Sequence, residues 1–370
     1  MLGKIKKYLY KFYSFYFKKN AYSTLFLNIT SFCNSNCAYC EVKNLDHSKD
    51  MSFERIIKLI KEAKQIGINH VYLSGGEPFV YPEIFKVLKQ AKKSGMRLSM
   101  ISNGLAIKNF NKEQLEIIKN CIDYIGISLD SADPKTHDSL RGIPGAFEST
   151  VQGIKILKQI GKNPVIYGVI SNKNYNELDK LILLADKLGV REMVFQPFHI
   201  WTNYSEVKAR EDKKNLLISE DYLKDIKPIM KKAVKLSKKI KVKTNLPVIY
   251  PWIDKYFQSQ GEKFNKNKLW FLNIIKDYRC VEPFTTLFIH SDGGIQPCAM
   301  IRQITNIKDK SLIDGIKDME NFKQMIKQRK FPSACQACSC QVATNYLFSV
   351  LNSPIRNMGK FIQLFKDLYL

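Results

Sequence analysis

Short apolar runs alternate with longer amphipathic stretches from residue 24 to residue 200, and this alternation constrains the fold more than any other feature. The segments between the runs place apolar residues at i, i+3, i+4 and i+7, which is the spacing of one helix face. The predicted strands are 24–30, 70–74, 97–102, 124–130, 164–170 and 192–198. Strands that alternate with helices in this way form a parallel sheet.

Glycines follow several of the helix-like segments, at positions 67, 95, 161 and 189, which is where a helix stops before a returning strand. Right-handed crossovers between successive parallel strands curl such a sheet. We therefore expect an α/β fold, a partial (β/α)6 barrel similar to the TIM barrel. In these barrels the chemistry lies at the carboxyl ends of the strands.

Three cysteines follow the first predicted strand, in "CNSNCAYC": Cys33, Cys37 and Cys40. A structural zinc site has four ligands and a disulfide has two cysteines, so three thiols on one loop suit a metal centre with an open position. The chain has nine cysteines, an odd number that favours metal binding in a reducing compartment over disulfides. Cys121, which stands alone, is expected to be a small buried apolar residue.

A second cysteine region lies near the C-terminus. Cys280 and Cys298 flank "HSDGG", which predicts the turn of a β-hairpin. Cys335 and Cys338 form a C-x2-C pair, and Cys340 has no obvious partner set. A zinc ribbon with four cysteine ligands is one interpretation of this region.

The C-x3-C-x2-C loop after the first strand of a βα array resembles the signature of the radical S-adenosylmethionine (SAM) superfamily. The resemblance covers roughly residues 24 to 340. It implies that Cys33, Cys37 and Cys40 bind a 4Fe–4S cluster whose open iron binds the methionine end of SAM. It further implies that one electron breaks the S–C5′ bond, and that a 5′-deoxyadenosyl radical abstracts hydrogen from a substrate.

Further motifs extend this resemblance to the SAM contacts. "SGGEP" resembles the loop that binds the SAM amino group, with glycines that let backbone carbonyls approach an ammonium and a carboxylate acceptor. "SNG" stands where the family binds the ribose, and "ISLD" where it contacts the methionine or ribose part. The implied SAM-binding residues are Tyr39 (adenine), Gly75, Gly76, Glu77, Pro78, Ser102, Asn103, Ser128 and Arg141 (carboxylate). Alternatives stay open: a surface role for Arg141, packing on the barrel for Tyr39, and a helix cap for Asp130.

The spacing C-x17-C … C-x2-C resembles a shortened SPASM module, or twitch subdomain, which carries an auxiliary 4Fe–4S cluster. The resemblance implies the ligands Cys280, Cys298, Cys335 and Cys338, with Cys340 as a substitute or a bystander. The expected domains are a basic N-terminal segment (1–22), a radical SAM core (23–200), a variable connector (201–279), a SPASM/twitch-like subdomain (280–345) and an amphipathic tail (346–370).

The net charge of +25 allows a second function, a zinc-stabilised nucleic-acid-binding protein. Only nine of the 59 basic residues are arginine, and no paired zinc knuckles are present, so we expect a lysine-rich solvated surface and no nucleic acid. The expected partners are SAM, an electron donor such as flavodoxin or ferredoxin, and a peptide, sugar-like or lipid-linked substrate. None of the five histidines has metal-ligand or triad spacing, so no catalytic residue is assigned.

The chain has no uncharged apolar run of membrane-spanning length and no secretory signal, which predicts a cytoplasmic protein. Its first twenty residues place apolar side chains at helical spacing among lysines, and the tail "MGKFIQLFKDLYL" is similar. Two interpretations of these ends stay open. They pack against the barrel, or they attach the protein reversibly at the inner membrane surface.

Overall fold

A ten-stranded sheet forms the centre of the computed structural model, which describes residues 22–42, 45–198, 213–218, 220–250, 253, 280–299 and 301–332. The strands lie in the order β10-β9-β8-β1-β2-β3-β4-β5-β6-β7. The six predicted strands are confirmed as β1 (Thr24–Thr30), β2 (His70–Gly75), β3 (Arg97–Ser102), β4 (Tyr124–Ser128), β5 (Val165–Ile170) and β6 (Glu192–Pro197). Each pairs in parallel with the next, and β6 also pairs in parallel with β7 (Lys243–Thr244).

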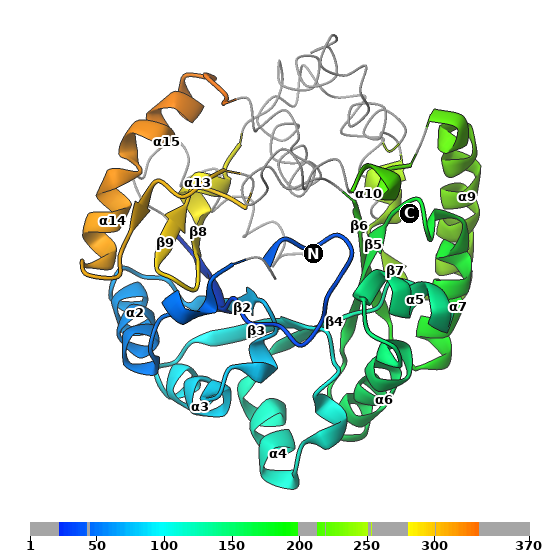
Figure 1. The fold of residues 1–370 in the computed structure, drawn as a ribbon, viewed down its shortest axis with the longest axis horizontal. Coiled ribbons are helices and arrows are strands. Elements are labelled where there is room, and N and C mark those ends of the chain that lie inside the picture. The colour runs from blue at the N-terminus through cyan, green and yellow to red at the C-terminus, as the bar shows by residue number, and fades with distance from the viewer. Residues whose placement is uncertain are drawn as a thin grey trace.

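The sheet curls, and helices cover its outer face (Figure 1). They are α2 (Phe53–Gln65), α3 (Ile84–Lys93), α4 (Lys112–Cys121), α5 (Pro134–Arg141), α6 (Ala146–Gln159), α7 (Leu178–Lys187), α9 (Glu220–Lys239) and α10 (Leu246–Ile249). The first of these shows why the sequence folds in this way. The hydroxyl of Ser52 accepts from the Arg55 backbone N–H and begins α2, whose apolar stripe is buried against the sheet. The expected partial barrel is confirmed.

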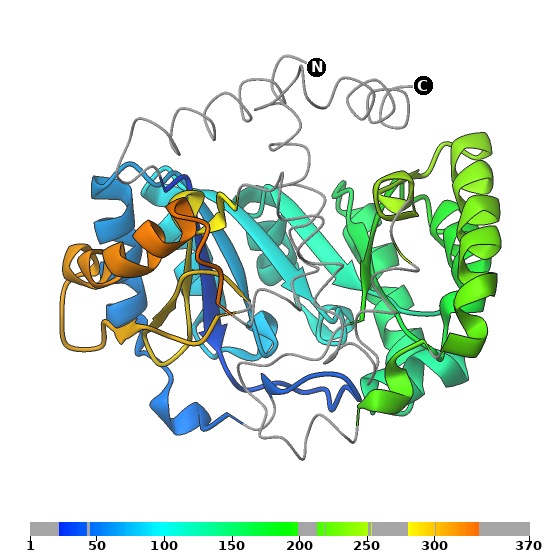
Figure 2. The same cartoon turned by 90° about the horizontal axis from the view of Figure 1, so that it is seen from above.

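The predicted hairpin is also confirmed, and it joins the main sheet. β8 (Thr286–Ile289) and β9 (Gly294–Gln296) are antiparallel around the "HSDGG" turn, and β10 (Thr305–Asn306) follows. β8 pairs in parallel with β1, from Thr24 opposite Thr286 to Leu27 opposite Ile289. Figure 2 shows the hairpin beside β1, the first strand of the core. The hairpin of the expected C-terminal subdomain thus continues the core sheet. It is accompanied by α13 (Glu282–Thr285), α14 (Leu312–Asp318) and α15 (Glu320–Lys327).

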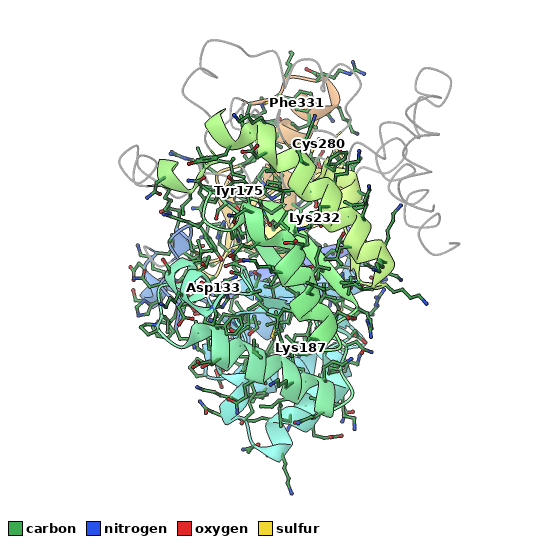
Figure 3. The ribbon with its side chains drawn as sticks, turned by 90° about the vertical axis from the view of Figure 1, so that its right-hand side faces the viewer. Asp133, Tyr175, Lys187, Lys232, Cys280 and Phe331 are labelled. Carbon is green, nitrogen blue, oxygen red and sulfur yellow. The ribbon has the colours of Figure 1, made fainter. Side chains whose placement is uncertain are left out.

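Helix α9 (Glu220–Lys239) lies within the expected connector. It lies along α7, and an ion pair of 2.7 Å between Lys232 and Asp179 joins the two helices (Figure 3). The expectations for the N-terminal segment, the tail and most of the connector fall outside the described residues. No helix in the described ranges has the length and apolar character needed to cross a membrane.

Candidate active site at the carboxyl end of the sheet

The cysteine loop begins where β1 ends, and the loop after β2 holds its first part. The backbone N–H of Gly76 donates to the carbonyl of Thr30 (2.7 Å), and that of Glu77 donates to the carbonyl of Phe32 (2.9 Å). A Cβ atom on Gly76 would lie 2.0 Å from the Phe32 carbonyl oxygen. Glycine is therefore required here for close contact between two backbones. Binding of the SAM amino group by Gly75, Gly76 and Pro78 stays a prediction.

The end of α5 holds the other side of the same loop. The backbone N–H groups of Asn36 and Ala38 donate to the carbonyls of Arg141 (3.0 Å) and Leu140 (2.9 Å). A Cβ atom on Gly142 would lie 2.1 Å from the Asn36 carbonyl oxygen, so this contact too depends on glycine. Backbone bonds on both sides fix the loop that carries the three thiols.

The three thiols lie in surroundings that suit a metal-bound thiolate. The N–H groups of Ser35 and Val42 donate to the sulfurs of Cys33 and Cys40, each at 3.4 Å, and Cys37 is buried. Burial raises the pKa of Cys33 to about 12 and raises that of Cys40, and the neighbouring thiols add to both effects. A cationic centre offsets such a penalty, because it stabilises thiolates.

These thiols are not gathered around the position of one ion. Within the described ranges, no three Cys, His, Asp or Glu side chains are placed to hold a single metal ion. In a 4Fe–4S cluster each thiolate binds a different iron, so its ligands do not converge on one point. The donor set therefore fits a three-cysteine iron–sulfur cluster.

Arg141 lies beside this loop, buried among acceptors. Its Nε is 2.9 Å from Asp130 Oδ2, its Nη1 donates to Cys37 Sγ (3.8 Å), and its guanidinium carbon lies 5.5 Å from the centre of the Tyr39 ring. The side chain is only 9% exposed, so the alternative of a surface arginine is wrong. Tyr39 is half-buried, packs near Phe198, and donates its hydroxyl to Asp130 Oδ2 (2.8 Å). Its packing on the barrel is confirmed, and its contact with adenine stays a prediction.

Glu77 lies at the centre of a second buried network. Its carboxylate accepts from the backbone N–H groups of Phe79 (3.0 Å) and Asn103 (2.7 Å) and from the hydroxyl of Ser102 (2.8 Å). Burial raises the pKa of Glu77 to about 7, although these hydrogen bonds lower it. The amide of Asn103 donates to Asn34 Oδ1 (2.7 Å), so it also supports the cysteine loop.

Ser128, at the end of β4, is half-buried opposite Tyr167. As with Glu77, Ser102, Asn103 and Arg141, its SAM contact stays a prediction. All of these residues lie at the carboxyl ends of neighbouring strands or in the elements that follow them, which is the face where we expected the site.

The second cysteine region is partly described. Cys280 and Cys298, which are 18 positions apart in sequence, pack with Phe331 against one small apolar cluster. The cluster consists of Val281, Phe284, Ile301, Phe322 and Ile326. Cys335, Cys338 and Cys340 lie outside the described residues, so this ligand set stays a prediction. The buried apolar role of Cys121 is confirmed.

Sequence reasoning missed the residue that connects much of the site. Asp130 was considered as a helix cap, but Asp133 caps α5 by accepting from the Thr136 N–H (2.8 Å). Asp130 instead bonds Arg141, Tyr39 and, through Oδ1, the Val169 N–H (2.9 Å). A polar residue at the end of a buried strand is the one signal that indicates such a role.

Two further residues that support the site were missed. His137 is fully buried and accepts from the Asp130 backbone N–H (3.2 Å). Asp50 accepts from the Thr30 hydroxyl (2.6 Å) and the Ser31 N–H (2.9 Å), and so holds the end of β1. Neither residue stands in a motif that sequence reasoning could use.

Family models match both cysteine regions. Residues 27–185 match the radical SAM superfamily, and residues 280–340 match an iron–sulfur cluster-binding domain, SPASM. An AdoMet-dependent heme synthase of Methanosarcina barkeri is 23% identical over 325 residues, 86% of this chain and 89% of that protein. A GTP 3′,8-cyclase of Thermodesulfovibrio yellowstonii is 27% identical over 312 residues, 81% of this chain and 88% of that protein.

Solved structures share the fold. Streptococcus suis SuiB bound to its precursor peptide SuiA aligns with a TM-score of 0.62 and 19% identity, over 93% of this chain and 75% of that one. Native anSMEcpe with bound AdoMet and a peptide aligns with a TM-score of 0.60 and 15% identity, over 92% of this chain and 99% of that one. The radical SAM domain implies SAM and a SAM-binding 4Fe–4S cluster, and the SPASM domain implies an auxiliary 4Fe–4S cluster. Together with the cysteine loop and its surroundings, the two family models identify the chain as an enzyme of the radical SAM superfamily.

Proposed function

We propose that this enzyme cleaves SAM reductively and uses the resulting 5′-deoxyadenosyl radical to abstract hydrogen from a substrate held near both cysteine regions. The observation that carries the proposal is the cysteine loop, fixed by backbone bonds at the carboxyl end of the sheet and bordered by buried Arg141 and Glu77. The cluster, when bound by Cys33, Cys37 and Cys40, supplies the electron that breaks the S–C5′ bond.

The chain's own residues would bind and orient SAM around this loop. Arg141, kept charged by its ion pair with Asp130, is suited to the SAM carboxylate. Glu77 and the backbone at Gly75 and Gly76 offer acceptors to the amino group. Ser102 and Asn103 offer a hydroxyl and an amide to the ribose, and Tyr39 offers a ring face to adenine.

The auxiliary cluster, with Cys280, Cys298, Cys335 and Cys338 as ligands, would accept the electron left on the substrate after hydrogen abstraction. An external donor such as flavodoxin or ferredoxin would reduce the SAM-binding cluster. We propose a peptide as the substrate, ahead of sugar-like or lipid-linked molecules. The structures of SuiB and anSMEcpe with peptides, which share this fold over most of the chain, support that choice.

Replacement of Cys33, Cys37 and Cys40 together by alanine tests the proposal. Reduced wild-type protein, reconstituted without oxygen, should convert SAM to 5′-deoxyadenosine and hold about eight irons. The triple variant should form no 5′-deoxyadenosine and keep about four irons in the auxiliary site. Alanine at Cys335 and Cys338 is the matched control, because it should remove the other four irons. Undiminished cleavage in the triple variant would refute the assignment.

We also propose that the protein attaches reversibly to an anionic membrane surface through its basic amphipathic ends. Apolar side chains at helical spacing beside lysines, as in the first twenty residues, support this. Flotation with anionic liposomes should carry the full-length protein upward at low salt and release it at high salt. Protein that stays at the bottom of the gradient at low salt excludes attachment.

A further inference from the structure

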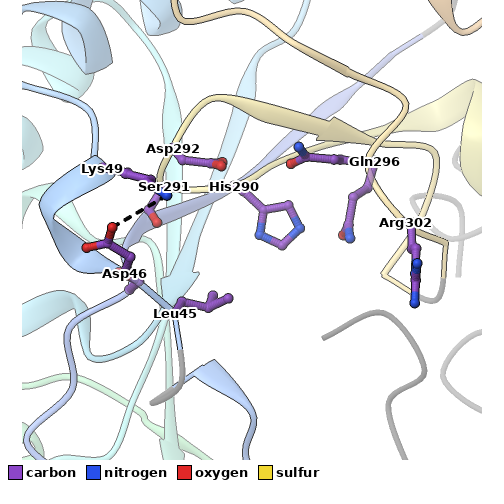
Figure 4. Close-up of a pocket in the computed structure, with 10 residues that line it drawn as sticks. Leu45, Asp46, Lys49, His290, Ser291, Asp292, Gln296 and Arg302 are labelled. Carbon is purple, nitrogen blue, oxygen red and sulfur yellow. Dashed lines mark ion pairs between the residues drawn. The ribbon is translucent and has the colours of Figure 1, made fainter. Parts of the chain in front are cut away.

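A pocket of about 330 Å³ lies between the segment that follows the cysteine loop and the β8–β9 hairpin (Figure 4). It is lined by Ser31, Leu45, Asp46, Lys49, His290, Ser291, Asp292, Gln296, Arg302 and Gln303. Ser31 stands two residues before Cys33, and Gln296 stands two residues before Cys298. A group bound in this pocket would therefore lie next to both cysteine regions.

The hairpin side of the pocket offers neutral hydrogen-bonding groups. His290 and Gln296 are buried, with 7% and 4% of their surface exposed. Asn28 Nδ2 lies 3.3 Å from His290 Nδ1, and the imidazole also forms a side-chain hydrogen bond with Gln296. Burial lowers the pKa of His290, which favours the neutral ring, although its hydrogen bond with Gln296 raises the pKa. Such groups suit the amides of a peptide, which both donate and accept.

The charges of the pocket differ in how they are paired. Lys49 lies 3.5 Å from Asp46, and Asp292 Oδ1 accepts from the Gly294 N–H (2.9 Å). Arg302 is exposed, and no carboxylate of a described residue lies within ion-pair distance of it. Two cations and two anions line the pocket, so it has no net positive charge that would favour a dianion over a single carboxylate. A guanidinium binds a carboxylate through two parallel hydrogen bonds.

We propose that this pocket binds an acidic residue of the substrate peptide, with the carboxylate on Arg302 and the neighbouring amides on His290 and Gln296. The inference rests on the proposed function, since it assigns part of that enzyme's substrate site. The volume equals that of about ten water molecules, which is enough for one side chain and the amides that flank it.

Binding of a small probe to the full-length, cluster-loaded protein with SAM tests the proposal without knowledge of the substrate. The probes are N-acetyl-glutamate N-methylamide, its glutamine counterpart and inorganic phosphate, followed by ligand-observed NMR titration. The acid should bind at least about tenfold more tightly than the amide, because a charge-assisted pair of hydrogen bonds is lost in the amide. Arg302→Gln should weaken binding of the acid by about tenfold and leave that of the amide unchanged.

Arg97→Gln is the matched control, because it removes another exposed arginine, at the start of β3, and should not alter binding of either probe. Equal affinity for acid and amide, or full binding of the acid by Arg302→Gln, overturns the proposal. Tighter binding of phosphate than of the acid also overturns it. Formation of 5′-deoxyadenosine by the wild type is measured separately, so failure of SAM cleavage refutes the proposed function while probe binding still judges the pocket.

Discussion

Replacement of Asp130 by asparagine tests the buried ion pair beside the cysteine loop. Asparagine keeps the size of the side chain and an oxygen that can accept from the Val169 N–H, but it removes the negative charge. Asp130 is 2% exposed, and its Oδ2 accepts from Tyr39 and pairs with Arg141. The substitution therefore leaves a buried guanidinium without its counter-ion.

The expected loss is about 3 kcal/mol of unfolding free energy. Removal of one partner from a buried pair costs roughly 3–5 kcal/mol, because the remaining charge stays desolvated. The lower end applies here, since the Tyr39 ring, 5.5 Å from the guanidinium carbon, still stabilises Arg141 by about 1 kcal/mol. The contact of Arg141 with Cys37 is also retained in the variant.

Urea unfolding of the anaerobic protein measures this loss. Glu113→Gln is the matched control, because it removes one carboxylate charge from the Lys89–Glu113 pair, whose atoms are 3.0 Å apart and whose side chains are 55% and 74% exposed. Solvent screens that pair, so the control should lose much less. Equal losses in the two variants would show that the buried pair contributes no more than a surface pair, and the reasoning above would be wrong.

Two further changes test the site. Gly76→Ala should cost about 2 kcal/mol of unfolding free energy and lower the iron content, because its Cβ would meet the Phe32 carbonyl at 2.0 Å. Gly161→Ala is the control: it strains a left-handed backbone (φ +83°), but no atom lies within 4 Å of its Cβ, so it should keep its iron, and equal iron loss in the two variants contradicts this reasoning. Burial lowers the pKa of His137 from 6.5 to about 4. Between these two values His137 is protonated in the unfolded chain but not in the folded one, so the folded state loses stability as the pH falls. From pH 7 to 5 the wild type should lose about 2 kcal/mol more of its unfolding free energy than His137→Asn, a variant that keeps an acceptor for the Asp130 N–H. Urea unfolding measures this loss, and parallel pH curves for the two proteins would exclude this role of His137.

Local patterns in the sequence were sufficient to predict the strands and helices of the core. The bounds of β1 and β3 match the predicted ranges, and the "HSDGG" turn connects β8 and β9 as expected. Such features depend on neighbours in sequence: an apolar run, a glycine, a turn motif. The three-cysteine loop could be predicted for the same reason, because its cysteines lie within eight positions.

The contacts that complete the site were not predictable in this way, because they join residues that are far apart in sequence. Asp130 pairs with Tyr39, 91 positions away, and the sequence around either residue shows nothing of the other. The glycines of "SGGEP" were attributed to SAM binding, which stays a prediction, and the structure adds that Gly76 is required for contact with the cysteine loop. A motif can show that a residue type matters without showing which neighbour requires it.

The pairing of β1 joins the two cysteine regions through one sheet. β1 lies between β2 and β8, with Leu27 opposite Leu73 on one side and Ile289 on the other. Cys33 follows β1 directly, and Cys298 follows the hairpin that begins with β8. A buried central strand deforms little, so we expect the separation of the two regions to stay the same when a substrate binds. Under the proposed function, electron transfer to the auxiliary cluster would depend on where the substrate binds. The proposed pocket at Arg302 is lined by Ser31 and Gln296, which stand two residues before Cys33 and Cys298.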